Sequence, residues 1–165
     1  MSVSKKITLK LDSKSIKEAI KQVNDYKKSF NRKVENLVET LVDEGIEIAK
    51  MQIREMGVSY TGELEESITG YFSPSLGVGI IKTDCPYAIF VEFGTGIVGK
   101  GSPHPAPEGW RYDVNAHGER GWVYFNERDQ KWHWTKGMKS RPFMYNTVKE
   151  LERIAGDKAK VVFRK

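Results

Sequence analysis

The chain has 165 residues, the size of one ordinary domain with its own core. Its hydrophobic fraction of 39% and charged fraction of 30% are typical of globular proteins and exclude a disordered or fibrous chain. A single cysteine, Cys85, excludes an intrachain disulfide and a multi-cysteine zinc site. No stretch approaches the roughly 20 apolar residues of a membrane span, and Met1 to Lys10 lacks a signal-peptide core. We expect one domain in a cytosol-like compartment, or released by lysis.

Charge is unevenly distributed along the chain. The formal net charge is +5, from 27 basic and 22 acidic side chains. Residues 1–57 hold 12 basic against 9 acidic side chains, residues 58–129 hold 5 against 10, and residues 130–165 hold 10 against 3. An acidic middle and a basic tail in one small domain favour self-complementary surfaces, or a face turned towards phosphate.

The first third of the chain predicts a strand and two helices. Apolar and polar residues alternate over 3–11, which is the period of a half-buried strand. Asp12 and Ser13 are good N-cap residues for a helix over about 13–29. After a candidate interruption at Ser29-Phe30-Asn31, an apolar stripe predicts a long amphipathic helix that lies on a sheet and ends at Gly57. The apolar residues of this stripe are Val34, Leu37, Val38, Leu41, Val42, Ile46, Ala49, Ile53 and Met56.

The middle of the chain predicts a hairpin and a short helix. Leu64 to Phe72 and Leu76 to Thr83 are rich in β-formers and are joined around Ser73-Pro74-Ser75, which predicts two paired strands. Residues 86–93 fit a short helix about as well as a strand, and the proline start and Gly94 end favour the helix.

Residues 94–120 contain six glycines and three prolines, so we expect an irregular loop that is functional or mobile. Beyond it, residues 121–126 and 131–135 alternate and predict a second hairpin that turns at Glu127-Arg128-Asp129. This alternation places Trp132 and Trp134 on one side of a strand and His133 on the other.

The last segment predicts a third helix and a final strand. Arg141-Pro142 opens the helix, because proline at the first helical position is pre-organised, and Gly156 ends it. Residues 161–163 form a short edge strand guarded by lysines.

The predicted fold class is α+β. A small, largely antiparallel sheet is packed by a long amphipathic helix and a C-terminal helix, with a long Gly/Pro/Trp-rich insertion loop. The single domain, 1–165, then divides into an N-terminal strand and helix (1–30), a long helix and hairpin (31–96), an insertion loop and hairpin (97–136) and a C-terminal helix and strand (137–165).

No motif for catalysis or metal binding is present. The three histidines, His104, His117 and His133, have no metal-helix spacing, and His104 and His133 are interpreted as a turn residue and a solvent-facing strand residue. The chain has no nucleophile elbow, phosphate-binding loop or dinucleotide fingerprint. We therefore expect a protein that is not an enzyme and that has no catalytic residue, metal or cofactor.

The aromatic residues of the insertion leave three interpretations open. They build a satellite core under the long loop, anchor an interface, or stack bases of a single strand beside the neighbouring basic residues. Nearby acids argue against the base-stacking platform. The tryptophans concerned are Trp110, Trp122, Trp132 and Trp134.

Three further residues attract attention for physical reasons. Gly62 and Gly94 are candidates for positive φ, where a side chain would clash. Glu92 stands in an apolar stretch and needs a partner if it is buried. The candidate partners are Arg141, Lys139 or a cation of a neighbouring subunit.

Several short strings together resemble a known family. In order along the chain they are Thr61-Gly62-Glu63-Leu64 with Ser67-Ile68, Tyr87-Ala88, Val91-Glu92-Phe93-Gly94-Thr95-Gly96, Gly137 and Arg141-Pro142-Phe143-Met144. In order and spacing they resemble the HK97-type gene-product-ten family, the small tail-completion or head-tail joining proteins of long-tailed bacteriophages. The resemblance spans about residues 30–156. Two departures are Val58-Ser59-Tyr60, near where the family often has a proline, and the long insertion at 97–136.

The resemblance implies a virion structural protein in the phage neck, present in the host cytoplasm before assembly. It implies a ring of identical subunits around the DNA channel, with neighbouring neck, connector and tail-tube proteins as partners, non-specific proximity to DNA and no membrane. The interface or fold-defining candidates are Thr61, Gly62, Glu92, Gly94, Thr95, Trp110, Trp122, Trp132, Trp134, Arg141, Pro142 and Phe143. The alternative is a basic nucleic-acid-binding module that uses the Trp-rich hairpin and the basic segment 130–165.

Overall fold

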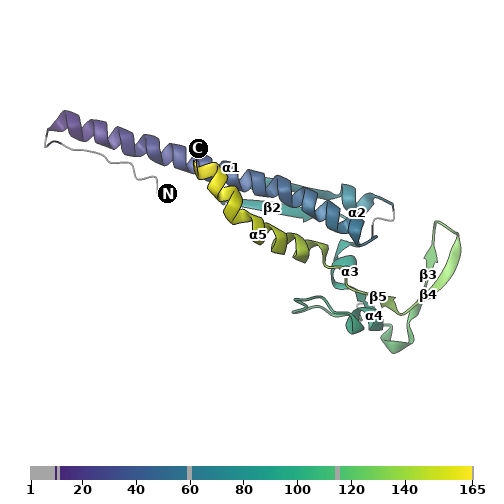
Figure 1. The fold of residues 1–165 in the computed structure, drawn as a ribbon. Coiled ribbons are helices and arrows are strands. Elements are labelled where there is room, and N and C mark those ends of the chain that lie inside the picture. Colours follow the sequence, from purple (N-terminus) through teal and green to yellow (C-terminus); the bar gives the residue numbers. More distant parts are fainter. Residues whose placement is uncertain (1–9, 11, 59–60, 114–115, 165) are drawn as a thin grey trace.

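The structure, a computed structural model, describes residues 10, 12–58, 61–113 and 116–164. The strand predicted at 3–11 lies outside the described residues, apart from Lys10. The first element, helix α1 (Ser13–Glu55), is capped by Asp12, whose side chain accepts a hydrogen bond from the Ser15 N–H at 2.8 Å. Figure 1 shows α1 as the longest element, with its second half covered by the other elements.

The interruption expected at Ser29-Phe30-Asn31 is wrong, because α1 is one continuous helix of 43 residues. The helix propensities of these three residues are only a few tenths of a kcal/mol below those of the best helix formers. The apolar spacing on either side stays in phase, since Val23, Phe30 and Leu37 follow one another at seven-residue steps. Local preference is therefore too weak to break a stripe that continues on one side of the helix.

The first predicted hairpin is confirmed, but its first strand begins later than expected. Residues Glu63–Glu66 form the short helix α2, and the strands are β1 (Ile68–Ser73) and β2 (Val78–Thr83), paired antiparallel from Ile68↔Thr83 to Ser73↔Val78. Three glutamates in the first turn of α2 favour helix because they complement its N-terminal dipole.

This hairpin packs on the second half of α1. A Cβ on Gly70 or Gly79 would lie within 2.8 Å of a Val42 methyl group, so the missing side chains let sheet and helix approach closely. The core forms where α1, the hairpin, α3 and α5 meet. Its buried members are Ala49, Ile53, Leu64, Ile68, Cys85, Ala88, Val91 and Phe143.

Segment 86–93 contains a helix, α3 (Ala88–Phe93), as expected. The following loop is not irregular throughout, because Gly96–Gly101 form a further helical turn and a half, α4, and Gly118–Arg120 form a 3₁₀ turn, η1. The second predicted hairpin is also confirmed, with strands β3 (Trp122–Asn126) and β4 (Lys131–Thr135). A two-residue strand, β5 (Gly137–Met138), follows it.

The predicted end of the C-terminal helix is wrong. Helix α5 (Phe143–Arg164) continues through Gly156, and residues 161–163 are helical rather than a strand. One glycine costs a helix only about 1 kcal/mol, and Phe163 gains a ring contact with Phe30 of α1, with centroids 5.5 Å apart. Packing of the two helices therefore decides the conformation of the last residues.

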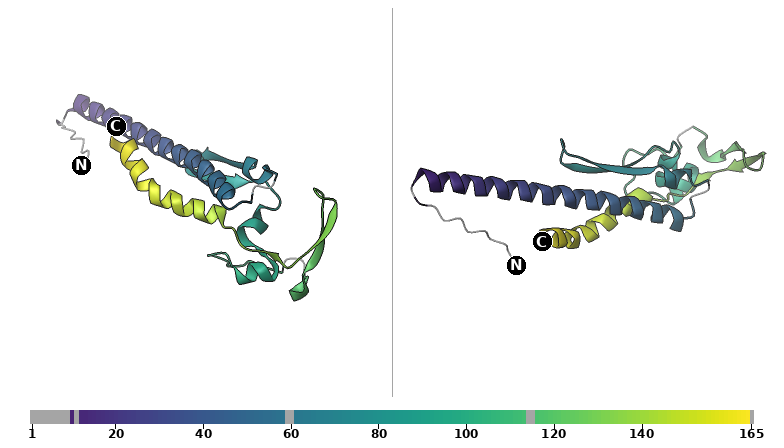
Figure 2. Two further views of the ribbon diagram at one scale, coloured as in Figure 1. Left: turned by 45° about the vertical axis from the view of Figure 1, so that its right-hand side comes forward. Right: turned by 90° about the horizontal axis from the view of Figure 1, so that it is seen from above.

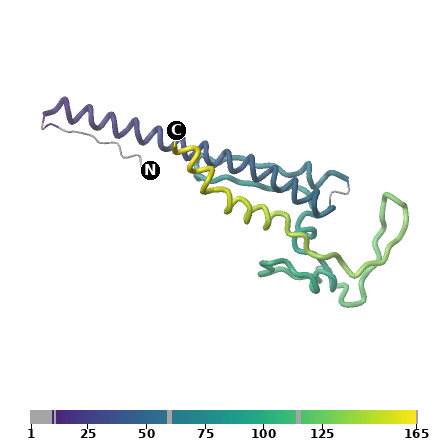
Figure 3. Tube along the Cα trace, viewed as in Figure 1, coloured from purple at the N-terminus to yellow at the C-terminus, as the bar shows by residue number. Residues whose placement is uncertain are grey.

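The fold class is α+β, as predicted, and the described part of the chain contains two separate two-stranded antiparallel sheets, β1–β2 and β3–β4, rather than one sheet. The molecule is elongated: the first half of α1 projects at one end and the β3–β4 hairpin at the other (Figures 1 and 2). The trace in Figure 3 shows that α5 runs back beside α1. Most of the family-like strings lie around α3 and before α5, where the chain connects α1, α5 and the β1–β2 hairpin to the β3–β4 hairpin.

Candidate functional site

Two strings far apart in the sequence meet in one place, which we name the Glu92 junction (Val91–Gly96, His104 and Gly137–Tyr145). Isolated bridges pair Thr95 with Met138 and Gly96 with Gly137. The Arg141 N–H donates to the Val91 carbonyl oxygen at 2.9 Å. Family-like strings separated by about forty residues in the sequence therefore form one structural unit.

Glycines make this approach possible. Gly94 has φ +77° and ψ 169°, and a Cβ there would lie 2.6 Å from the Ser140 nitrogen. Gly137 has φ +103°, and a Cβ there would lie 1.9 Å from the Thr95 carbonyl oxygen. Positive φ and backbone contact together exclude other residues at both positions.

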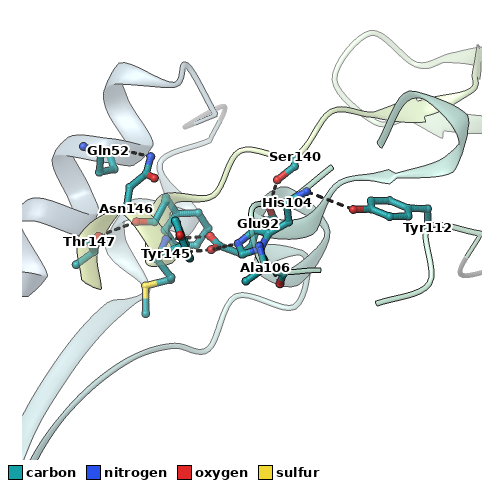
Figure 4. A network of polar contacts seen from close by, with 11 residues as sticks. Gln52, Glu92, His104, Ala106, Tyr112, Ser140, Tyr145, Asn146 and Thr147 are labelled. Carbon is teal, nitrogen blue, oxygen red and sulfur yellow. Dashed lines mark hydrogen bonds and ion pairs between the residues drawn. The ribbon is translucent and has the colours of Figure 1, made fainter. Parts of the chain in front are cut away.

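Glu92 reaches from α3 to the start of α5 and is only 7% exposed. Its Oε2 accepts a hydrogen bond from the Met144 N–H, and its Oε1 accepts one from the Tyr145 N–H, both at 2.9 Å. The Nε2 of His104 lies 3.0 Å from the same Oε1 (Figure 4). The buried carboxyl group thus has a partner at both oxygens.

These contacts cap α5 from a distant segment. The first N–H groups of a helix have no partner within it, and Pro142, just before α5, offers no side-chain acceptor. The Phe143 N–H donates to the Arg141 carbonyl oxygen and the Asn146 N–H to that of Pro142. Glu92 accepts the two N–H groups between them, and its negative charge complements the helix dipole.

His104 is a buried partner of Glu92, not the simple turn residue expected from the sequence. It is 5% exposed, and its ring lies 4.4 Å from the Phe93 ring and 5.3 Å from the Tyr145 ring, between centroids. A carboxylate only accepts hydrogen bonds, so Nε2 is the donor to Glu92. Nδ1 lies 3.0 Å from the Ala106 nitrogen and 2.9 Å from the Ala106 carbonyl oxygen, so both ring nitrogens have polar neighbours. No histidine spacing signals this pair, since the two residues are twelve positions apart on different elements.

The two cations in this chain that were expected to pair with Glu92 do not do so. Among the described residues, the side chain that contacts the Glu92 carboxyl group is that of His104, not that of Arg141 or Lys139. The Nε of Arg141 is buried without a hydrogen-bond partner in the described part of the chain. Phe143, in the same string, is 1% exposed and fills the core.

The tryptophans divide between two environments. Trp110 belongs to a satellite core: its Nε1 donates to the Gly94 carbonyl oxygen at 3.0 Å, and its ring stacks on Phe93 at 5.0 Å. Trp122 is half-buried and stacks on His117. Trp132 and Trp134 are 70% and 59% exposed.

The exposed tryptophans share one face of the β3–β4 hairpin with other apolar residues. The register pairs Val123 with Trp134 and Phe125 with Trp132, so these four side chains lie on the same face. We name them the hairpin face. His133 lies on the opposite face, as predicted, and its Nε2 is 2.7 Å from Asp129 Oδ2.

Thr61 and Gly62 lie immediately before α2. The Thr61 hydroxyl accepts the Glu63 N–H at 3.3 Å, and Gly62 has φ +83°, as the sequence predicts. Burial raises the pKa of nearby Tyr87, and its hydrogen bond with Thr61 acts in the opposite direction. This turn places Leu64 in the core, where it is 1% exposed.

A cavity of about 520 Å³ lies beside the Glu92 junction. Its lining is mostly apolar, and the Glu92 oxygens at its wall already accept hydrogen bonds from α5. The lining residues are Thr83, Ala88, Ile89, Glu92, Phe93, His104, Ala106, Phe143, Met144, Tyr145 and Val148. The described residues contain no group of three or more His, Cys, Asp or Glu side chains that could hold a metal ion. They also contain no helix long and apolar enough to cross a membrane.

Comparison of the chain with family models, with curated proteins and with solved structures finds no match. Function is therefore inferred from the geometry of the described residues and from the family-like strings.

We expect Glu92→Gln to destabilise the fold by about 3 kcal/mol, because an amide presents a donor to N–H groups that need acceptors and leaves buried partners unsatisfied. Hydrogen exchange at the Met144 and Tyr145 amides should accelerate, and urea unfolding should give the free-energy change. Glu108→Gln, at an exposed glutamate, is the matched control and should change stability by less than about 0.5 kcal/mol. Equal stability of the two variants would contradict the capping role.

Proposed function

We propose that the protein is a non-enzymatic virion structural protein of a tailed phage. In this proposal it is a tail-completion or head-tail connector component of the neck, forming a ring of identical subunits around the DNA channel. The ring joins the filled head to the tail by docking on neighbouring connector and tail-tube proteins.

One observation carries the proposal. The strings that resemble the phage family are scattered over the sequence, yet Val91–Gly96 and Arg141–Met144 meet in the Glu92 junction through backbone bridges and the cap of α5. Residues that contact one another in the fold support a family resemblance more strongly than short strings that share only their order along the sequence. The Thr61-Gly62 string leads into Leu64, which packs in the same core as Phe143.

The surface also supports a protein that works with neighbours. Monomeric soluble proteins rarely expose large continuous apolar patches, and such patches mark interaction sites. Here the hairpin face is exposed at one end, and apolar residues of α1, including Ile20 and Val23, are about half exposed at the other. A closed ring needs two different surfaces on each subunit, and two such surfaces are present.

The experiment is a stop codon in this gene of a phage that encodes it, with complementation from a plasmid. We expect filled heads beside unattached tails, or tails of abnormal length, in electron micrographs of the lysate. The plasmid copy should restore joined particles. Intact infectious particles without the protein would overturn the proposal.

A second candidate, a nucleic-acid-binding module, is favoured by one observation. Trp132 and Trp134 are exposed, and the Lys136 ammonium group lies 5.4 Å from the centre of the Trp134 ring. Exposed aromatic rings beside cations can stack bases of a single strand.

The two candidates differ in their binding to random DNA as salt rises. Protein that neutralises phosphates loses affinity steeply with salt, so the nucleic-acid candidate requires tight binding at low salt that falls with a steep slope. We expect the unmodified protein to bind random DNA negligibly at moderate salt. The Trp132→Ala variant should show the same DNA binding. Tight, salt-sensitive binding that this variant abolishes would favour the second candidate.

A further inference from the structure

The first half of α1 carries an apolar face that its own subunit covers only in part, through the contact of Phe30 with Phe163 of α5. The exposed fractions of its members range from 36% to 55%. They follow one another at three- and four-residue steps, so they share one side of the helix. We name them the α1 face: Ile16, Ile20, Val23, Tyr26, Phe30 and Val34.

The hairpin face has the same character at the other end of the molecule. Its four residues, Val123, Phe125, Trp132 and Trp134, are 41% to 70% exposed. A two-stranded hairpin alone is marginally stable in water and usually needs a third strand or a helix packed on its apolar face. Among the described residues the β3–β4 sheet has two strands, and its apolar face is exposed.

The protein already contains the type of contact that would cover both faces. The second half of α1 packs on the other two-stranded hairpin, β1–β2, with Val38 and Val42 against Gly79. The α1 face continues this stripe towards the start of the same helix. The α1 face runs about 27 Å along the helix from Ile16 to Val34, and the five-residue strands of the second hairpin span about 17 Å, so the helix face is long enough to cover the hairpin face.

One subunit cannot bring its own two faces together, because α1 is a continuous helix and its first half and the β3–β4 hairpin lie at opposite ends (Figures 1 and 2). We propose that the α1 face of one copy packs on the hairpin face of the next copy, as the head-to-tail contact between subunits. Such a contact joins different surfaces, so it closes into a ring when its rotation allows. This inference rests on the proposed function, because it names the contact between neighbouring subunits of the proposed ring.

Charge favours this contact over pairing of two α1 helices. Residues 13–34 contain seven lysines and arginines against two acidic residues, so two such segments repel each other. Residues 106–136, which lead into and include the whole β3–β4 hairpin, contain five acidic and five basic side chains, so this segment lacks the net positive charge that makes two α1 segments repel each other.

Disulfide trapping tests the contact. Val23→Cys and Val123→Cys place a near-isosteric thiol on each face, in a background in which the buried Cys85 is replaced by alanine. The two purified variants are mixed, with one of them isotope-labelled so that the mixed dimer differs in mass from both homodimers. The concentration is raised stepwise into the millimolar range, dissolved oxygen oxidises the thiols to disulfides, and the disulfide-linked dimers are resolved by mass spectrometry. We expect the mixed Val23→Cys/Val123→Cys dimer to exceed either homodimer by about tenfold.

Three further variants give the controls. Leu76→Cys, at a 70% exposed residue on the tip of the other hairpin, replaces Val123→Cys and should give no preferred dimer with Val23→Cys. Trp134→Ala, added to the Val123→Cys variant, should lower the mixed dimer about tenfold, because exposed tryptophans often anchor interfaces. Leu76→Ala, added to the Val123→Cys variant instead of Trp134→Ala, should leave the yield of the mixed dimer unchanged.

The outcomes separate this inference from the proposed function. A dominant Val23→Cys homodimer would show helix pairing and overturn the inference, as would the absence of any preferred dimer at the highest concentration. Either result leaves the proposed function in place if loss of the gene still separates heads from tails. A preferred mixed dimer from a gene whose loss leaves infectious particles would keep the contact and overturn the proposed function.

Discussion

The arrangement of this protein depends on one carboxyl group that caps a distant helix. Glu92 lies near the end of α3 and accepts the N–H groups of Met144 and Tyr145, so it fixes where α5 begins and how it faces the core. A buried carboxylate is costly unless both oxygens have partners. His104 completes the set by holding Oε1, and its ring lies against Phe93. The cost of burying Glu92 is thus offset only when α3, α5 and the loop around His104 are all in place.

The same junction sets the direction of the outer hairpin. Thr95 and Gly96 pair with Met138 and Gly137, immediately after strand β4, and Gly94 permits that backbone approach. Trp110 seals the region by donating to the Gly94 carbonyl oxygen. A hairpin that has no core of its own is therefore attached to the body through several backbone contacts rather than through a single linker. This attachment presents the hairpin face, with Trp132 and Trp134, outward at one end of the molecule.

Much of the fold could be predicted from local patterns, and the rest depended on contacts between distant residues. The alternation of side-chain types over 121–126 and 131–135 was sufficient to predict the second hairpin and which residues share each of its faces. The reason is that the side-chain period of a strand is independent of its surroundings. The break at Ser29–Asn31 and the helix end at Gly156 were wrong, because weak local preferences yielded to an in-phase stripe and to the Phe30–Phe163 contact. The sequence indicated that Glu92 needs a partner, but not that His104 and the start of α5 supply it. No spacing rule connects residues on three separate segments.

We propose, above all, that this body, held together by Glu92, is a subunit of a ring in the neck of a tailed phage. The decisive measurement is cryo-electron microscopy of the neck in particles of a phage that encodes the chain. We expect a ring between head and tail whose subunits fit α1, α5 and the Glu92 junction as one body, with each β3–β4 hairpin against a neighbouring copy. A neck density that other chains fill completely, with no place for this fold, would contradict the proposal.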